Sequence, residues 1–141
     1  MEIKTLNLNL VRPIEEELML DNLVYFSKNF DRSQIKQPFP LIYLEGEYLL
    51  GDGHHRCFCL FHKGFRELPF AIIDDEDFEF FPNSSLFTKY CSTCEIINQY
   101  TNFWKEDLDR RGIKRIGDYP VPEHILNRIS SSTRLNNYLV A

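Results

Sequence analysis

The short glycine-containing segment at residues 51–56 constrains the fold of this chain more than any other feature. It follows an apolar stretch at residues 48–50 and precedes residues 54–63, which can form a helix that ends at Gly64. The segment, called the glycine loop below, reads Gly51-Asp52-Gly53-His54-His55-Arg56. Glycine allows the backbone to turn sharply and to approach a ligand closely. The sequence therefore predicts a strand, a tight loop and a helix in immediate succession.

The start of such a helix is suited to phosphate binding. Its first N–H groups have no partner within the helix, and the helix dipole places partial positive charge there. Arg56 lies in the first turn and can hold a phosphate with two hydrogen bonds, while His54 and His55 can each donate from a ring nitrogen. The alternative interpretation is a glycine turn in which Asp52 caps an ordinary helix and the histidines lie on the surface. A cap alone, however, requires neither two adjacent histidines nor an arginine behind them.

The sequence around the loop predicts a small α+β domain. Apolar and polar residues alternate over residues 3–10, which predicts a strand with one buried face. The spacing of apolar residues predicts a helix over residues 15–28, with Glu15 in a first turn of three glutamates, where the dipole favours negative charge. Residues 41–44 and 48–50 predict a hairpin, and residues 69–73 predict another strand.

The remainder of the chain has helical periodicity. One helix, continuous or broken, is expected over about Phe87 to Arg110, a second from near Pro122, and a third, shorter one from Thr133 onward. We therefore divide the chain into a domain at residues 1–82 and a helical C-terminal extension at residues 83–141, packed on that domain.

Charge and hydropathy exclude several classes of partner. The net charge is -5 and the sequence pI about 5.4, so DNA binding is disfavoured unless basic residues gather on one face. We interpret the basic cluster near residue 110 as a solvated helix end; it comprises Arg110, Arg111, Lys114 and Arg115. No apolar run approaches the roughly 20 residues of a membrane span, and the N-terminus does not resemble a secretion signal. We expect a cytoplasmic protein with no membrane partner.

The four cysteines are expected to be reduced. Cys91 and Cys94 form a C-x-x-C pair, but no second matching pair follows to complete a zinc site. Cys57 and Cys59 would point in different directions on a helix. We therefore interpret the thiols as buried apolar groups.

The glycine loop resembles that of the ParB/sulfiredoxin superfamily, whose members share a Gly-x-x-Arg phosphate loop, here Gly53 to Arg56. The resemblance covers about residues 3 to 75. Sulfiredoxins carry Gly-Cys-His-Arg with a reactive cysteine where this chain has His54, so sulfiredoxin chemistry is not expected. ParB proteins carry Gly-Glu-Arg-Arg, which matches only at the first and last positions.

The closest resemblance is to the ParB-like free serine kinases, which carry Asp-Gly-His-His-Arg, complete here from Asp52 to Arg56. Those kinases also have a Leu-x-Pro-x-Glu element whose glutamate is implicated as catalytic base. The corresponding segment reads Val11-Arg12-Pro13-Ile14-Glu15, with valine in place of leucine. The resemblance thus implies that Glu15 accepts the proton of a substrate hydroxyl.

The resemblance implies a ParB/sulfiredoxin-like small mixed sheet with flanking helices, and a site for ATP or another nucleotide. The nucleotide site would comprise Gly51, Asp52, Gly53, His54, His55 and Arg56. Asp52 would also place a Mg²⁺ ion, and the acceptor would be a small hydroxylated metabolite such as a free amino acid. Two alternatives stay open: a non-catalytic DNA-associated or regulatory module, and an interaction module that keeps the fold without its ligand.

Overall fold

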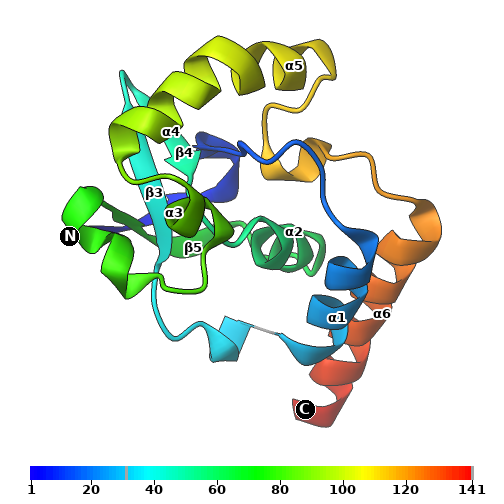
Figure 1. Ribbon diagram of the computed structural model, residues 1–141. Helices are drawn as coiled ribbons and strands as arrows, with labels where there is room; N and C mark the ends of the chain where they lie inside the picture. The colour runs from blue at the N-terminus through cyan, green and yellow to red at the C-terminus, as the bar shows by residue number, and fades with distance from the viewer. Residues whose placement is uncertain (31, 141) are drawn as a thin grey trace.

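The computed structural model describes residues 1–30 and 32–140, and within them five strands form one mixed sheet flanked by six α-helices (Figure 1). The α+β class predicted from the sequence is thus confirmed. The strands are β1 (Glu2–Asn7), β2 (Val11–Arg12), β3 (Phe39–Leu44), β4 (Glu47–Leu50) and β5 (Glu67–Ile72). The helices are α1 (Leu20–Asn29), α2 (His54–His62), α3 (Ser85–Lys89), α4 (Thr93–Gln99), α5 (Lys105–Arg110) and α6 (Glu123–Val140).

The strand order in the sheet is β1-β5-β3-β4-β2. β1 runs antiparallel to β5 and β3 antiparallel to β4, whereas the β5–β3 and β4–β2 pairs are parallel. The predicted hairpin is the β3–β4 pair, and its turn places Glu45 and Gly46 at φ 46° and 89°. Two successive positive φ angles match the right-handed twist of the paired strands, which explains the tight connection.

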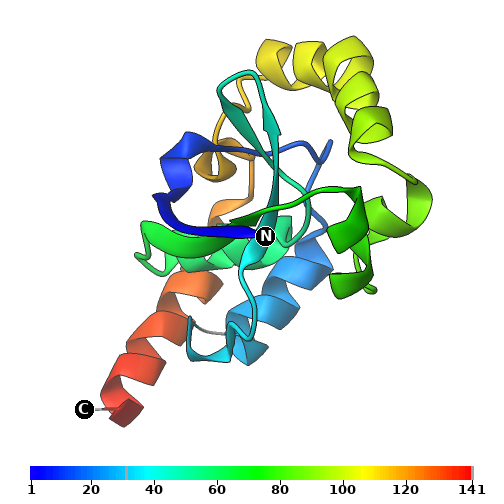
Figure 2. The same ribbon diagram turned by 90° about the vertical axis from the view of Figure 1, so that its left-hand side faces the viewer.

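Both faces of the sheet are covered, so the central strands are continuously apolar. Leu41 and Leu50 belong to a hydrophobic cluster with residues of α1, α2 and α6, whereas Ile42 and Leu49 belong to a second cluster with residues of α3 and α4. Residues beyond 82 contribute to both clusters. The α4–α5 region and α6 lie at opposite ends of the molecule (Figure 2).

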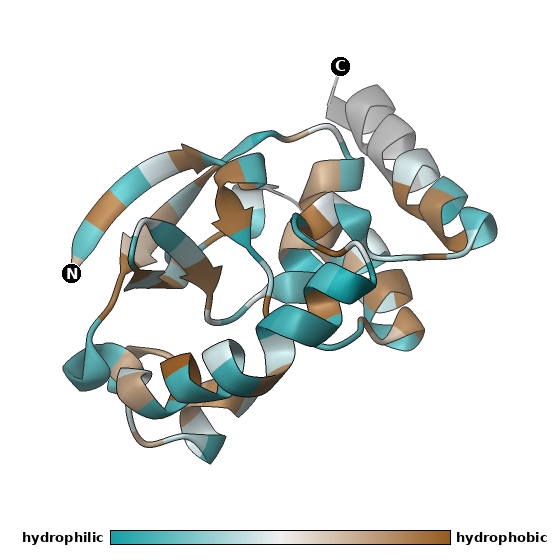
Figure 3. Ribbon diagram, turned by 90° about the horizontal axis from the view of Figure 1, so that it is seen from above, coloured by the Kyte–Doolittle hydropathy of each residue, from teal (hydrophilic) through white to brown (hydrophobic). Residues whose placement is uncertain are grey.

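The predicted strand at residues 3–10 is too long. β1 ends at Asn7, and Leu8–Leu10 form a 3₁₀-helix in which Leu8 is buried and Leu10 is 61% exposed. The Asn7 side chain accepts a hydrogen bond from the Asn9 N–H, a local contact that competes with strand pairing. Apolar and polar residues do alternate along β1 (Figure 3), and the chain then pairs again as β2, next to β4.

The helix predicted over residues 15–28 begins later than expected. α1 starts at Leu20, so Glu15 and the two glutamates after it precede the helix. The segment before α1 is bound to α2 instead, because the N–H groups of Ile14, Glu15 and Met19 donate to the two imidazole rings at the start of α2. The apolar periodicity thus located the helix, but long-range hydrogen bonds determine its start.

The C-terminal helices also differ from prediction. The helical region expected over residues 87–110 takes the broken form of the two expected, because Ser92 caps α4 by accepting a hydrogen bond from the Glu95 N–H at 3.1 Å. A π-helical stretch, Tyr100–Trp104, then connects α4 to α5. The two helices expected from Pro122 and Thr133 are one continuous helix, α6.

Replacing Gly53 with alanine should destabilise the protein by about 2–4 kcal/mol. Its φ is +89°, and an added Cβ would lie 2.5 Å from Cδ1 of Phe39. Gly64→Ala is the matched control, because Gly64 has φ +102° but open space around it, so only about 1–2 kcal/mol should be lost. Urea unfolding measures both values, and equal losses would contradict close packing of the loop on Phe39.

Candidate functional site

The glycine loop connects β4 to α2 in the geometry expected of an anion site. Gly53 is the N-cap of α2 in a left-handed conformation and, as a glycine, provides no side-chain cap to the first N–H groups of the helix. Asp52, the alternative cap, instead accepts a hydrogen bond from Nη2 of Arg56 at 3.1 Å. The first turn of α2 therefore keeps N–H groups that a bound anion can use.

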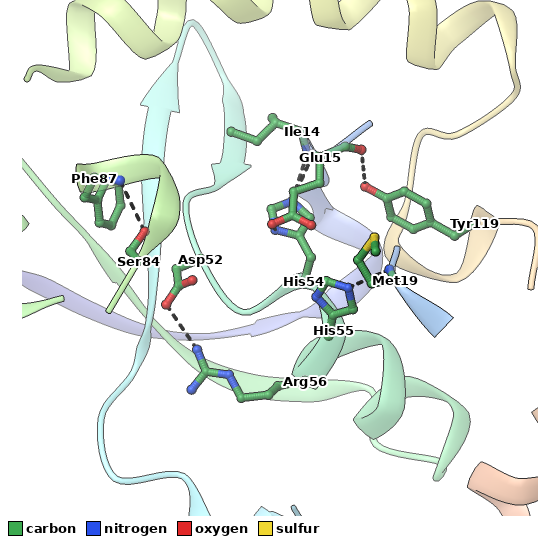
Figure 4. Close-up of polar contacts among 10 residues, drawn as sticks. All are labelled: Ile14, Glu15, Met19, Asp52, His54, His55, Arg56, Ser84, Phe87 and Tyr119. Carbon is green, nitrogen blue, oxygen red and sulfur yellow. Dashed lines mark hydrogen bonds and ion pairs between the residues drawn. The ribbon is translucent and has the colours of Figure 1, made fainter. Parts of the chain in front are cut away.

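The loop forms one wall of a cleft of about 430 Å³, called the loop cleft below. Glu15, Asp52 and Arg56 line it together (Figure 4), and residues 82–85 form another part of its rim. Within this rim, Ser84 is buried and its hydroxyl accepts a hydrogen bond from the Phe87 N–H at 3.3 Å. The structure thus brings the predicted base and five of the six predicted nucleotide-binding residues, those at 52–56, to one cavity, whereas Gly51 does not line it.

The Arg56 guanidinium is held in place by its neighbours. It lies over the rings of Phe39 and Phe30, at 5.2 and 5.9 Å from their centroids, and pairs with Asp52. Stacking on aromatic faces and a carboxylate partner restrict a side chain that is otherwise flexible. Arg56 can therefore contact an anion in the loop cleft with little further ordering.

His54 is placed differently from what its assignment as a phosphate ligand anticipates. The ring is 1% exposed, and its Nε2 accepts hydrogen bonds from the N–H groups of Ile14, at 3.0 Å, and Glu15, at 3.3 Å. Its Nδ1 lies 3.6 Å from Oε1 of Glu15. Burial, with a smaller effect of His55, lowers the pKa of His54 to about 3, so the ring is neutral at neutral pH.

His55 has a related position. Its Nε2 accepts a hydrogen bond from the Met19 N–H at 2.8 Å, directly before α1, and burial lowers its pKa. The two adjacent histidines thus have a structural role, because their hydrogen bonds fix the segment that contains Glu15. That role explains their presence without a ligand, although both also line the loop cleft.

Residues of the C-terminal extension hold the Glu15 segment from its other side. The Tyr119 hydroxyl donates to the Glu15 carbonyl at 2.7 Å, and Nη1 of Arg111 donates to the Glu16 carbonyl at 2.7 Å. Arg12 pairs with Asp109. Sequence reasoning missed these residues, since nothing local marks a contact with a segment about a hundred positions away.

The Glu15 carboxyl group is suited to proton transfer near neutral pH. Burial and the nearby charge of Asp52 raise its pKa to about 7. Burial also raises the pKa of Asp52, against the opposing effect of Arg56. Asp52 thus disfavours the ionisation of Glu15 in the cleft that both line, an effect that a bound cation would relieve.

The donor chemistry of the loop cleft fits Mg²⁺. This ion is commonly bound by one or two carboxylates, with phosphate oxygens and water completing its shell. Asp52 would hold it, as the family resemblance implies, near the start of α2. Within residues 1–30 and 32–140 no group of three or more histidine, cysteine or acidic side chains is arranged to hold a metal.

A second cleft of about 560 Å³, called the aromatic cleft below, adjoins the first. Its own lining includes Lys89, Tyr90 and Trp104. The two clefts share a wall of five residues, namely Glu15, Asn22, His54, His55 and Ser85. Glu15 can therefore be reached from two cavities, a feature that sequence reasoning did not anticipate.

The predicted basic cluster is largely neutralised by acidic neighbours. Arg110 and Arg111 both pair with Asp107, and Arg115 pairs with Asp118 at 3.7 Å. These pairs agree with a solvated helix end, except that Arg111 also donates to the Glu16 carbonyl.

The prediction for the cysteines is correct for one pair and wrong for the other. Cys57 and Cys59 are buried under α1 and the sheet, and the Cys59 thiol donates to the Leu23 carbonyl at 3.5 Å. Cys91 and Cys94 are exposed, because they flank the residue that caps α4 at the surface.

A scan against models of known protein families matches none of them, and a search of curated proteins also finds no match. Within the described parts of the chain, no helix combines the length and apolar character needed to cross a membrane.

Glu15→Gln should change how stability depends on pH. Because the pKa of Glu15 is raised from 4.5 to about 7 on folding, the folded protein binds more protons than the unfolded chain between these values. The contribution of Glu15 to stability therefore falls as pH rises through this window. As the pH rises from about 5 to about 8, the free energy of unfolding of the variant, measured in urea, should therefore increase relative to that of wild type. A difference that stays constant with pH would contradict the raised pKa.

Proposed function

We propose that this chain is a nucleotide-binding protein of ParB/sulfiredoxin type that transfers a phosphoryl group to a small hydroxylated metabolite. The observation that carries the proposal is the position of Glu15 in the wall between two clefts. One cleft has an arginine and an uncapped helix start, which suit a phosphate donor, and the other has room for an acceptor. A base between donor and acceptor is the arrangement that phosphoryl transfer to an alcohol requires.

The phosphates of ATP or another nucleotide would lie in the loop cleft. Backbone N–H groups of the first turn of α2 and the Arg56 guanidinium would bind them, because both bear positive charge and donate hydrogen bonds. A bound Mg²⁺ ion, held by Asp52, would offset negative charge on the phosphates. Because Gly53 has no side chain, it can adopt the left-handed conformation at the start of α2 while Phe39 and the Arg56 guanidinium pack closely against it.

The acceptor would lie in the aromatic cleft. Its lining combines Tyr90 and Trp104 with a basic residue, Lys89, and acidic ones, Glu16 and Glu17, so it suits a small molecule with apolar, anionic and cationic parts. A free amino acid with a hydroxyl group has this character.

In the proposed reaction, the acceptor oxygen forms a bond to the terminal phosphorus while the bond from phosphorus to the bridging oxygen breaks. The hydroxyl proton moves to Glu15, and the nucleotide leaves with one phosphate fewer. A base with a pKa near 7 is well matched to this role at neutral pH. Arg56 stabilises the charge spread over the transferred group.

Arg56→Ala should weaken nucleotide binding by about 10- to 100-fold, since hydrogen bonds to charged groups contribute about 1.5–3 kcal/mol. Titration calorimetry with ATP, ADP and CTP measures the affinity. Arg66→Ala is a matched control, because Arg66 also stacks on a ring, that of Phe61 at 4.1 Å, but lines neither cleft. Equal affinities for wild type and the Arg56 variant would rule out the proposed phosphate site.

Phosphotransfer can be tested with ATP or ADP, Mg²⁺ and a panel of small hydroxylated metabolites that includes free serine, followed by phosphorus NMR. We expect a phosphomonoester product, and about a 10²- to 10⁴-fold slower rate in Glu15→Gln, the usual contribution of a general base. Asp21→Asn removes an exposed carboxylate at the start of α1 and should retain activity. If no nucleotide is consumed with any acceptor, the kinase proposal fails.

A further inference from the structure

We infer that His54 is a positioning residue for Glu15. Its neutral ring donates a hydrogen bond from Nδ1–H to the Glu15 carboxylate, while its Nε2 accepts a hydrogen bond from the Glu15 backbone. His54 would then act through the glutamate and would not bind the nucleotide. Its role as an aid to a catalytic base rests on the proposed function, whereas the imidazole–carboxylate arrangement does not.

The tautomer follows from the hydrogen bonds of the ring. Nε2 accepts from two backbone N–H groups, those of Ile14 and Glu15, so this nitrogen carries no proton. A neutral imidazole has one N–H group, which must then be at Nδ1. The buried position of the ring, 1% exposed, opposes a second proton.

The Nδ1–H group has one evident acceptor. Among the described residues it has no hydrogen-bond partner, although it is fully buried. Oε1 of Glu15 lies 3.6 Å away, outside the range of about 2.7–3.2 Å for an N–H···O hydrogen bond, so the carboxylate must move closer to accept. Because the Glu15 side chain is 36% exposed, it has the freedom to close this gap. Figure 4 shows the carboxylate beside the ring.

Contacts around the pair make the direction of the carboxylate important. The Glu15 carbonyl is fixed by Tyr119 and its N–H by His54, so the backbone cannot turn away. Only the Glu15 side chain can still adopt different rotamers in the shared wall of the two clefts. A donor at Nδ1 would hold one carboxylate oxygen and leave the other for the substrate proton.

NMR of the histidine rings tests the arrangement without any substrate. Nitrogen shifts of wild-type protein above neutral pH should identify His54 as the Nδ1–H tautomer, with a downfield Hδ1 signal. In Glu15→Gln this signal should move upfield, because a neutral amide oxygen accepts a weaker hydrogen bond than a carboxylate. An Nε2–H or doubly protonated ring, or an Hδ1 signal unchanged in Glu15→Gln, would overturn the inference.

Two substitutions separate the two functions of the ring. The amide oxygen of His54→Gln can accept the backbone N–H groups in place of Nε2, but the variant lacks the Nδ1 donor; His54→Asn does the reverse. We expect His54→Gln to keep ADP affinity within about threefold of wild type while the turnover rate falls at least tenfold. A loss of ADP affinity as large as that of Arg56→Ala would assign the ring to the nucleotide and refute the positioning role. If wild type binds no nucleotide, the proposed function fails while the NMR result still decides the arrangement.

Discussion

The backbone N–H groups of residues 14, 15 and 19 donate hydrogen bonds to the imidazole rings of the first two residues of α2, and the site depends on these bonds. They hold an irregular segment between β2 and α1 against the start of another helix. A side chain on such a segment would otherwise have many positions. Because the rings are buried or half-buried and their pKa values are lowered, they remain neutral acceptors at neutral pH. Glu15 thereby acquires a defined position next to the glycine loop.

The C-terminal extension completes this position. Tyr119 and Arg111 bind carbonyl groups of the same segment whose N–H groups bind α2, so both sides of its backbone have partners. The extension also covers the second face of the sheet through residues such as Phe87 and Ile96, and it supplies Trp104 to the aromatic cleft. The extension and the α+β part thus pack into one unit whose residues together line the two clefts.

Features of the chain that depend on near neighbours could be predicted from the sequence. The hairpin, the glycine loop and α2 followed from turn residues and apolar spacing within about twenty positions, and all three are present. The end of β1 and the start of α1 were misplaced because hydrogen bonds of Asn7 and of the two imidazole rings override periodicity there. The shared wall of the clefts was beyond prediction, since it needs contacts such as that of Tyr119 with Glu15, 104 positions apart.

Helix α1 is joined to α2 at both of its ends. His55 accepts the Met19 N–H just before α1, and the Lys63 ammonium at the end of α2 donates to the carbonyls of Ser27 and Phe30, at 3.0 and 2.9 Å. The two helices are therefore expected to move as a single body. If the loop cleft adapts to ligands of different size, we expect residues 82–85 to move, because they line the cleft and belong to neither helix. Helix α1 would keep its position.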